Sequence, residues 1–505
     1  MNPLSDRIAA ILELDPAAPA LEFERRWYTW ADLAQTAADV DRALRAAGAE
    51  AGAPVGVLLR NRPVPVGLVL GVLRAEACLV TINPTLGADR VRADLERLDL
   101  AVLAGERPDV ETHVGDELAG RTVVLTLDDL GSAPEPAPPS THAAPPPSPG
   151  VAVRMLTSGT TGPPRRIDLT YETLWRVMQG AKHYEANAKD ELRLRTGVVV
   201  VNSPMVHLGG LFRIIQAVTD GRSFALLERF AVEPWIDAVR RHAPRTVSLV
   251  PAALRMVYDA DLDPADFASV QSAVSGTAPL DPDLAEAFTA RYGVPVLTSY
   301  AATEFGGGVA GWNLKDYQQF ASEKRGSVGR AHAGCALRVV DEASGEPLPS
   351  GDVGLLEVRA DQIDAAQWIR TTDLARLDDD GFLWIVGRAD QTILRGGFKV
   401  QPETVRVALL RHPAVVDAVV FGVDDDRLGQ VPVAVVQPAA DESVTDTELV
   451  EHARELLAPY EVPVTIAVVD ALARTPSQKV DLAATREWFA ARQAMSTSSS
   501  RDSSK

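Results

Sequence analysis

Short apolar runs alternate with longer amphipathic stretches over the first part of the chain. Residues 55–59 and 78–82 are apolar runs of strand length, and residues 65–75 between them have the length of a helix. Thr29 precedes another amphipathic stretch and is a typical N-cap for a helix that continues to about Ala47. Elements that alternate in this way build parallel sheets covered by helices. The pattern therefore predicts an α/β fold with doubly wound sheets packed with helices.

Two segments interrupt the alternation. Residues 131–150 contain eight prolines among alanines and serines, and because proline lacks a backbone N–H, we expect a surface linker here. A second change comes near residues 387–390, after which a compact stretch has strand-like runs of its own. We therefore predict a large N-terminal domain over residues 1–389 and a small, mobile α+β C-terminal domain over residues 390–495. The Ser-rich residues 496–505 are predicted to be disordered.

The overall composition excludes several classes of protein. Hydrophobic residues make up 46% and charged residues 24%, as in soluble globular proteins. The net charge of −19 argues against a nucleic-acid surface, which needs an excess of Lys and Arg. Only two cysteines occur, Cys78 and Cys335, too few for a secreted disulfide framework. Neither a signal peptide nor an uninterrupted transmembrane run is visible, so we expect a cytoplasmic protein.

The most informative stretch follows the apolar run at residues 151–156. Four hydroxyl side chains and two glycines stand within residues 157–162, and two arginines follow at positions 165 and 166. Such a loop can surround phosphate oxygens with hydroxyls and backbone N–H groups, and arginine adds fixed positive charge. A polar hairpin loop is the alternative. The candidate phosphate-binding residues are Thr157, Ser158, Gly159, Thr160, Thr161 and Arg165.

This loop resembles the phosphate-binding signature of the adenylate-forming enzymes, the superfamily of acyl-CoA synthetases, peptide synthetase adenylation domains and luciferases. Arg165 and Arg166 replace the usual Lys-Gly. Further segments of the same family follow in the expected order and span nearly the whole chain, with Ala301 and Gln478 in place of glycines. These segments are residues 202–211 of the acyl pocket, 275–280 beside the adenine, 299–304, Thr372-Asp373, the hinge motif at 387–390, and 474–481.

The resemblance implies an ATP-dependent acid–CoA ligase, most like an acyl-CoA synthetase, that works through an acyl-adenylate with ATP, Mg²⁺ and coenzyme A. A carboxylate is ionised at neutral pH, so its attack on the α-phosphorus needs charge neutralisation and alignment rather than a general base. By this resemblance the site residues are Lys479 bridging carboxylate and α-phosphate, Thr303 on the α-phosphate, Glu304 on Mg²⁺, His207 in the acyl pocket, Gly276, Thr277, Ala278 and Tyr300 around the adenine, and Asp373 and Arg388 on the ribose. Each of three residues also has a purely structural interpretation when taken alone. Asp373 could be a turn residue, Lys479 a surface lysine and His207 a hydrogen-bonded interior histidine.

The resemblance also implies a second half-reaction, in which the small domain rotates about Asp390 and a thiol attacks the adenylate. Gly396 and Gly397 would let the pantetheine of coenzyme A pass, although an ordinary β-turn is the alternative. Residues 401–406 depart from the family pattern. An acyl carrier protein is therefore the alternative acceptor, and a non-catalytic nucleotide-binding member is the alternative class.

The acid is less well determined than the reaction. Amino-acid-activating relatives place an Asp in the pocket segment, and residues 205–212 contain no acidic residue. We therefore expect an acid without an α-amine and with an apolar fatty or bulky body. Residues 306–311 satisfy G-x-G-x-x-G but precede no evident helix, so we interpret these glycines as close backbone packing near the acyl pocket.

Overall fold

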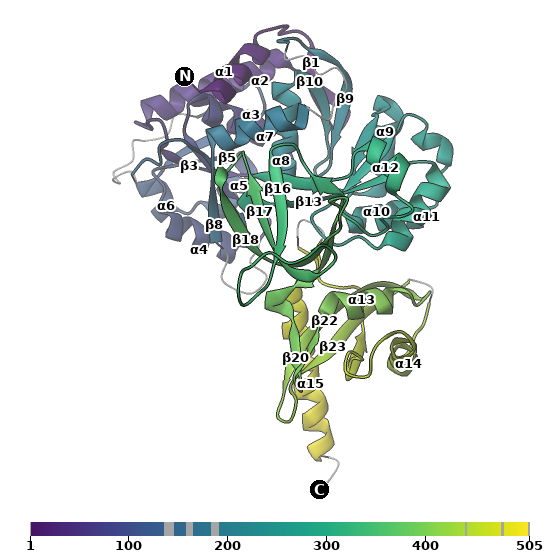
Figure 1. The fold of residues 1–505 in the computed structure, drawn as a ribbon. Coiled ribbons are helices and arrows are strands. Elements are labelled where there is room, and N and C mark those ends of the chain that lie inside the picture. The colour runs from purple at the N-terminus through teal and green to yellow at the C-terminus, as the bar shows by residue number, and fades with distance from the viewer. Residues whose placement is uncertain are drawn as a thin grey trace.

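The computed structural model describes residues 2–135, 146–157, 165–182, 191–439, 442–475 and 479–502. Figure 1 shows a large unit at the top and a small unit beneath it, with the C-terminal helix extending away from both. The last strand of the large unit, β19 (Leu383–Arg388), and the first strand of the small unit, β20 (Ile393–Arg395), are joined by a single turn of 3-10 helix, η3 (Ala389–Gln391).

The large unit is built around a six-stranded sheet with the order β6-β5-β3-β4-β7-β8, in which only the β7–β8 pairing is antiparallel. The predicted apolar runs form two of its central strands, and all their residues are buried. The α/β prediction is therefore confirmed. The strands are β3 (Pro54–Leu58), β4 (Cys78–Ile82), β5 (Val102–Glu106), β6 (Val123–Leu127), β7 (Val151–Thr157) and β8 (Arg165–Thr170).

Two helices, α2 (Trp30–Ala46) and α3 (Pro63–Arg74), pack closely against each other beside this sheet. The predicted N-cap is confirmed, since the Thr29 side chain accepts the Asp32 N–H at 3.2 Å and the Asp32 carboxylate accepts the Thr29 N–H at 2.7 Å. Close contact requires glycine at Gly71, where a Cβ would lie 2.5 Å from the Cβ of Val40.

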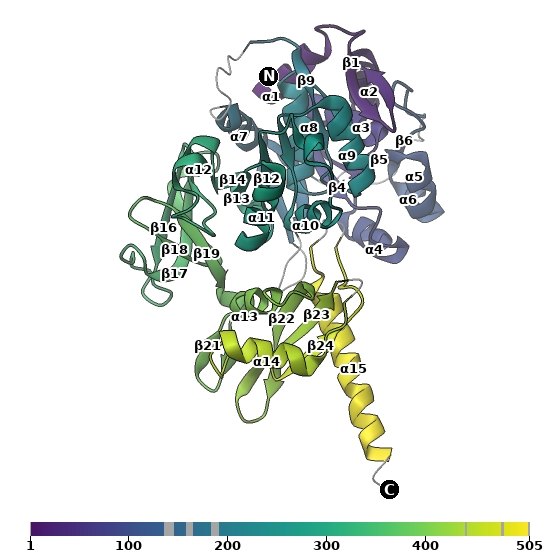
Figure 2. The same ribbon diagram turned by 90° about the vertical axis from the view of Figure 1, so that its right-hand side faces the viewer.

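Two further sheets complete the body of the large unit. One has the order β2-β1-β10-β9, and the other has the order β11-β12-β13-β14-β15. Figure 2 shows helices packed around these sheets. The strands are β1 (Pro19–Phe23), β2 (Arg26–Thr29), β9 (Arg195–Val201), β10 (Arg222–Leu226), β11 (Thr246–Ser248), β12 (Ser272–Ser275), β13 (Val296–Ala302), β14 (Gly307–Gly311) and β15 (Arg330–Ala331). The remaining helices of the large unit are α1 (Pro3–Leu12), α4 (Ala88–Leu98), α5 (Arg107–His113), α6 (Asp116–Arg121), α7 (Tyr171–Lys182), α8 (Leu208–Thr219), α9 (Val232–His242), α10 (Pro251–Asp259), α11 (Pro282–Tyr292), α12 (Leu314–Phe320), η1 (Pro264–Phe267) and η2 (Thr303–Phe305).

An antiparallel sheet of β16 to β19 leads to the small unit, whose own sheet has a separate hydrophobic core. The first of these sheets consists of β16 (Cys335–Val340), β17 (Val353–Ala360), β18 (Asp364–Leu377) and β19. The small unit consists of β20, β21 (Phe398–Val400), α13 (Pro402–Leu410), β22 (Val415–Asp425), β23 (Gly429–Pro438), α14 (Asp446–Leu456), β24 (Thr465–Val468) and α15 (Leu482–Asp502).

The C-terminal helix continues into the segment for which the composition predicts disorder. The backbone is helical as far as Asp502. An existing helix extends at a lower free-energy cost than a new one needs for nucleation, so serines can follow a formed helix. Both cysteines are free thiols, Cys78 buried and Cys335 half-buried. None of the described helices combines the length and the hydrophobicity that a bilayer crossing requires.

Gly71→Ala should lower the midpoint of thermal unfolding, because a methyl group there overlaps Val40. Overpacking costs about 1–3 kcal/mol, which exceeds the gain of about 1 kcal/mol in helix propensity. Gly120→Ala is the matched control, since Gly120 in α6 has nothing within 4 Å of its Cβ position. Equal midpoints for the two variants would show that the α2–α3 contact is not tightly packed.

Candidate active site

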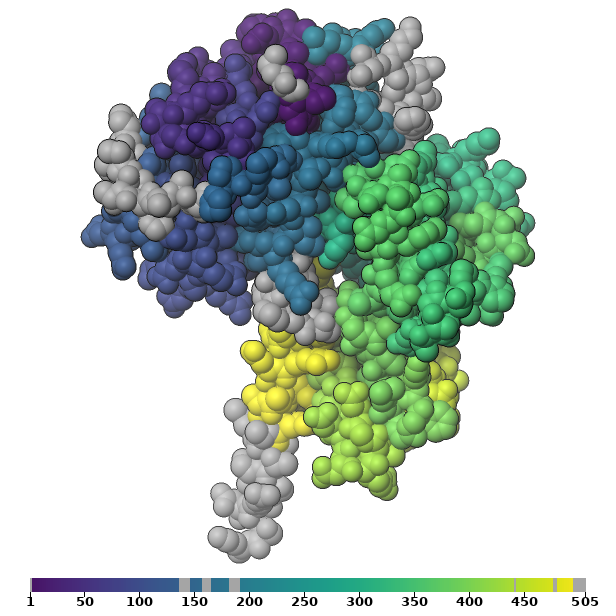
Figure 3. Space-filling view, turned by 60° about the vertical axis from the view of Figure 1, so that its left-hand side comes forward, coloured from purple at the N-terminus to yellow at the C-terminus, as the bar shows by residue number. Residues whose placement is uncertain are grey.

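A cavity of about 2800 Å³ lies between the large and small units. Its walls include the ends of β7 and β13, helices α7 and α8, and residues of the small unit around Arg474 and Lys479. Figure 3 shows the large unit above and the small unit below, meeting around a hollow on this face. Ten of the predicted site residues line this one cavity, whereas Arg165, Asp390, Gly396 and Gly397 are not among the described residues that line it.

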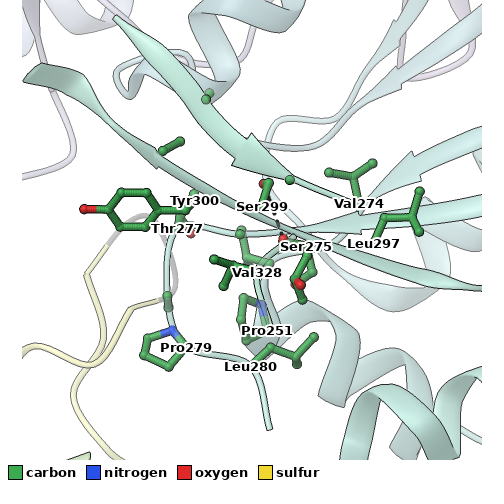
Figure 4. A pocket seen from close by; sticks show the side chains of 18 of the residues that line it. Pro251, Val274, Ser275, Thr277, Pro279, Leu280, Leu297, Ser299, Tyr300 and Val328 are labelled. Atoms are coloured by element: carbon green, nitrogen blue, oxygen red, sulfur yellow. Dashed lines mark hydrogen bonds between the residues drawn. The ribbon is translucent and has the colours of Figure 1, made fainter. Parts of the chain in front are cut away.

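The loop after β12 forms one side of the cavity. A Cβ on Gly276 would lie 2.7 Å from Ser299 Oγ, so the backbone can run this close to β13 only as glycine. Thr277 has a φ of +72°, an uncommon conformation for a β-branched residue and one that is found at functional sites. Figure 4 shows Thr277 beside Tyr300, with Pro279 and Leu280 further along the loop. The predicted adenine-side residues are therefore adjacent in space.

A chain of polar contacts holds the next part of the site. The Tyr300 hydroxyl donates a short hydrogen bond to Asp373 Oδ2. Asp373 on β18 lies directly opposite Arg388 on β19 in the antiparallel register. Burial, followed by the charge of Asp373, raises the pKa of Tyr300, so the phenol stays protonated and remains a donor. These three predicted residues thus form one connected group.

Arg388 links this group to the hinge. Its guanidinium donates to Asp390 through Nε at 2.9 Å and Nη2 at 2.8 Å, and also to Thr372 Oγ1 at 2.6 Å. The bond to Asp390 is the main cause of its raised pKa. The predicted pivot residue therefore lies in direct contact with the predicted ribose donor.

Thr303 and Glu304 lie in the short helix η2, which follows β13, and both line the cavity. The Glu304 carboxylate has no hydrogen bond or ion pair with the residues that the structure describes. No group of three or more His, Cys, Asp or Glu side chains gathers as a metal site within the described ranges. At this point the described residues thus offer a single unpaired carboxylate as a metal ligand, and not a complete set of protein ligands.

Lys479 and His207 lie in the same cavity, although they come from different units. Burial lowers the pKa of His207 to about 4, and the positive charge of Lys479 contributes to the shift. His207 is therefore neutral at physiological pH, and its buried Nε2 has no hydrogen-bond partner in the described part of the chain. Removal from water also lowers the pKa of Lys479, with a smaller effect from the charge of Arg388. The structure thus groups Lys479, His207 and Arg388.

The predicted phosphate loop falls largely outside the described residues, which exclude Ser158, Gly159, Thr160, Thr161 and also Gln478. The flanking strands are described. Thr157 ends β7 and pairs with Arg165 at the start of β8, and Arg165 is exposed. Arg166 pairs instead with Asp94 at 2.5 Å and donates to the Thr81 carbonyl at 2.9 Å, so the second arginine is used inside the large unit.

The Gly396-Gly397 pair forms the turn between β20 and β21. Both residues have positive φ, +57° and +89°, which suits the tight hairpin turn that two glycines allow. Neither is among the described residues that line the cavity, whereas Lys479 is. In this arrangement the small unit presents the lysine to the large unit.

The sequence analysis missed two groups of charged residues in the cavity wall. One is an ion-pair network of the small unit, in which Arg406 pairs with Glu403 at 2.8 Å and Arg474 pairs with Asp417 at 2.7 Å. The other is Arg213 on α8. Its signal was present in the sequence, because Arg213 stands one helical turn after Gly209 in an otherwise uncharged helix and therefore shares a face with it.

Comparison with known proteins agrees with this geometry. The family model of the AMP-binding enzyme matches residues 9–364, and that of the AMP-binding enzyme C-terminal domain matches residues 405–479. A sulfoacetate–CoA ligase of Cupriavidus necator is 30% identical, over 90% of this chain and 91% of its own. A 2-succinylbenzoate–CoA ligase of Bacillus velezensis is 28% identical, over 93% of this chain and 94% of its own.

Solved structures share the fold. ATP-bound MatB from Rhodopseudomonas palustris has a TM-score of 0.81 at 22% identity, over 97% of this chain and 99% of its own. The o-succinylbenzoate CoA synthetase from Bacillus subtilis, in complex with its acyl-adenylate intermediate, has a TM-score of 0.77 at 24% identity, over 95% and 97%. The two-unit architecture is therefore that of adenylate-forming enzymes.

Tyr300→Phe should raise the KM for ATP about tenfold, because a hydrogen bond to a charged group is lost while the ring remains. Asp373 would then be held less firmly opposite Arg388. Initial rates of pyrophosphate release at varied ATP measure this effect, with the KM for the acid as the internal control. An unchanged KM for ATP would remove Tyr300 from the positioning of Asp373.

The lowered pKa of Lys479 predicts an alkaline loss of activity. The cationic form carries the charge, so kcat/KM for ATP should fall as pH rises through a midpoint below that of an ordinary lysine. Lys479→Arg should be slower overall, but its kcat/KM should not fall over this alkaline range, because arginine stays charged. Parallel alkaline profiles for both proteins would assign the titration to another group. His207 should produce no inflection near pH 6.5, since its pKa is about 4.

Proposed function

The chain belongs to the AMP-binding enzyme family and is an acid–CoA ligase working through an acyl-adenylate, and we propose that it activates a carboxylic acid with an apolar body and no α-amine. The site assignments below are part of this proposal. The observation that carries it is the meeting of Lys479, His207 and the Tyr300–Asp373–Arg388 group at one cavity.

ATP occupies the part of the cavity between the β12 loop and the β18–β19 pair. The adenine lies against the Tyr300 ring and the backbone of residues 276–278. Asp373 accepts hydrogen bonds from the ribose hydroxyls, and Arg388 donates to the ribose. The hydroxyls and N–H groups of residues 157–161, with Arg165, surround the phosphates, where glycine permits close approach.

Glu304 is the protein ligand for Mg²⁺. Its carboxylate lines the cavity without an ion pair to any described residue, and carboxylate oxygens suit this hard cation. With this single carboxylate, Glu304 would hold the ion together with oxygens that the protein does not supply. The bound ion would neutralise part of the phosphate charge.

In the first half-reaction, a carboxylate oxygen of the acid attacks the α-phosphorus of ATP. The new P–O bond gives the acyl-adenylate, and the bond to the β-phosphate oxygen breaks to release pyrophosphate. Lys479 and Thr303 hold the α-phosphate and the carboxylate, so that two anions can approach. His207 is neutral and lines the acyl side of the cavity.

In the second half-reaction, the thiol sulfur of coenzyme A attacks the acyl carbonyl. A thioester forms, AMP leaves with the bonding electron pair, and the thiol proton passes to solvent. We propose that the small unit first rotates about Asp390, which withdraws Lys479 and brings the Gly396-Gly397 turn to the cavity. A hinge can act at such a position because one or two residues absorb the change in φ and ψ.

The acyl side of the cavity supports an acid with an apolar body. Trp175, Val177 and Phe212 line it, and the glycines after η2 leave the wall close to bare backbone. A Cβ on Gly306 would lie 2.6 Å from Thr173 Cγ2, which agrees with the prediction of close backbone packing at these glycines. An acyl carrier protein is the alternative acceptor of the acyl group.

The deciding assay is pyrophosphate release from ATP and Mg²⁺ across a panel of carboxylic acids, each with and without coenzyme A. Release with a preferred acid, and a thioester only with coenzyme A, supports the proposal. Release without a thioester would favour a carrier protein. Failure of the enzyme to bind ATP would support a non-catalytic protein.

Lys479→Ala should reduce pyrophosphate release about 10²–10³-fold, as loss of a transition-state donor does. With chemically prepared acyl-adenylate, thioester formation by this variant should continue, because the lysine acts only in the first step. Lys315→Ala, which removes an exposed lysine outside the cavity, is the control. Unchanged pyrophosphate release in Lys479→Ala would remove Lys479 from the mechanism.

A further inference from the structure

Arg213 is the one charged residue of α8, and it lies in the wall of the cavity. No carboxylate of the described chain pairs with it, and no described group accepts a hydrogen bond from its guanidinium. Burial lowers its pKa without a counteracting charge. A guanidinium nevertheless stays protonated in proteins, so the cavity wall carries an uncompensated positive charge at this point.

The other cations of the cavity wall are used differently. Among the described lining residues, each Lys or Arg other than Arg213 and Lys479 has a carboxylate partner within 4.0 Å. Those paired cations are Arg176, Arg255, Lys324, Arg325, Arg388, Arg406 and Arg474. Lys479 is assigned to the reacting carboxylate and the α-phosphate. Arg213 is therefore left as the lining cation that no described carboxylate neutralises.

The space beside Arg213 is open. Gly209 lies one turn earlier on the same helix face, and a Cβ there would meet nothing within 4 Å. Side chains on a helix lean toward its N-terminus, so the Arg213 side chain extends over the turn that contains Gly209. Gln216 lies on the same face and also lines the cavity. A ligand can therefore reach the guanidinium from the acyl side.

The reacting carboxylate is assigned to Lys479 of the small unit, whereas Arg213 lies on α8 of the large unit. His207 is the N-cap of α8, and the backbone of Arg213 stands about 9 Å further along the helix axis, from where its side chain leans back toward Gly209. Trp175 and Phe212 are apolar residues that line the same cavity. An anion at Arg213 is thus bound by a different cation, from a different element, than the carboxylate that becomes adenylated.

We propose that Arg213 binds a second anionic group, a carboxylate or a sulfonate, at the far end of the acid substrate. The proposal rests on the proposed function and refines its substrate class to an acid with an apolar body and two anionic ends. The planar guanidinium fork matches the two oxygens of such a group. Arg213 is half-buried, and pairing with substrate relieves the cost of a partly desolvated, unpaired charge.

The test compares straight-chain dicarboxylic acids of increasing length with the monocarboxylic acid of the same length. With the full-length enzyme, kcat/KM for pyrophosphate release should favour a diacid over its monoacid by about tenfold or more. Arg213→Met should abolish that preference and keep activity on the monoacid, and Arg213→Lys should restore part of it. Arg176→Met is the matched control, since Arg176 lies on the same cavity wall but already pairs with Glu172.

A second measurement does not depend on turnover. Calorimetry with Mg²⁺ and α,β-methylene-ATP, from which pyrophosphate cannot leave, should show tighter binding of the diacid than of the monoacid, and equal binding in Arg213→Met. Equal binding of both acids by the unaltered enzyme would overturn the assignment of Arg213. Diacid-selective binding without any pyrophosphate release would support Arg213 while contradicting the proposed adenylation.

Discussion

The pairing of β18 with β19 is the constraint on which the site depends. It sets Asp373 opposite Arg388, and the Tyr300 hydroxyl from a different sheet fixes the Asp373 carboxylate. A slip of one residue in this register would turn the side chains of the slipped strand to the other face of the sheet, so Asp373 and Arg388 would no longer lie opposite each other. Strand β19 ends at Arg388, whose guanidinium donates to Asp390 in the short turn that leads to the small unit. One antiparallel pair thus holds the Tyr300–Asp373–Arg388 group and leads directly into the small unit.

Few positive charges in the cavity wall are left without a neighbouring negative charge. Most basic side chains of its wall are neutralised by neighbouring carboxylates, as Arg406 is by Glu403 and Arg474 by Asp417. Among the described residues that line the cavity, Lys479 and Arg213 are the cations without a carboxylate partner, against a net charge of −19 for the whole chain. Arg213 lies on α8 and Lys479 in the small unit, so the two positive charges come from the walls of different units. The positions of these two charges therefore favour one orientation of a bound anion in the cavity and also contribute to its affinity.

The fold could be predicted from the sequence because it depends on local signals, whereas the candidate nucleotide-binding residues came from the resemblance to the adenylate-forming enzymes. Thr29 begins its helix as predicted, and residues 55–59 and 78–82 lie almost exactly within buried parallel strands. The contacts between distant segments could not be predicted, since no spacing rule relates Tyr300 to Asp373 or Lys479 to His207. Arg213 was missed for another reason, because the acyl-pocket segment that the family resemblance identifies ends before it, whereas the helical period places Arg213 on the same face as Gly209, one turn further on.

The cavity has walls from two units that are joined by one short turn. A molecule that touches both walls has more contacts when the units are docked than when they are apart, so binding shifts the balance toward docking. By thermodynamic reciprocity, docking raises the affinity for that molecule by the same factor. A ligand that contacts both walls is therefore a removable crosslink between the units, and any loss of its contacts with one wall weakens their docking.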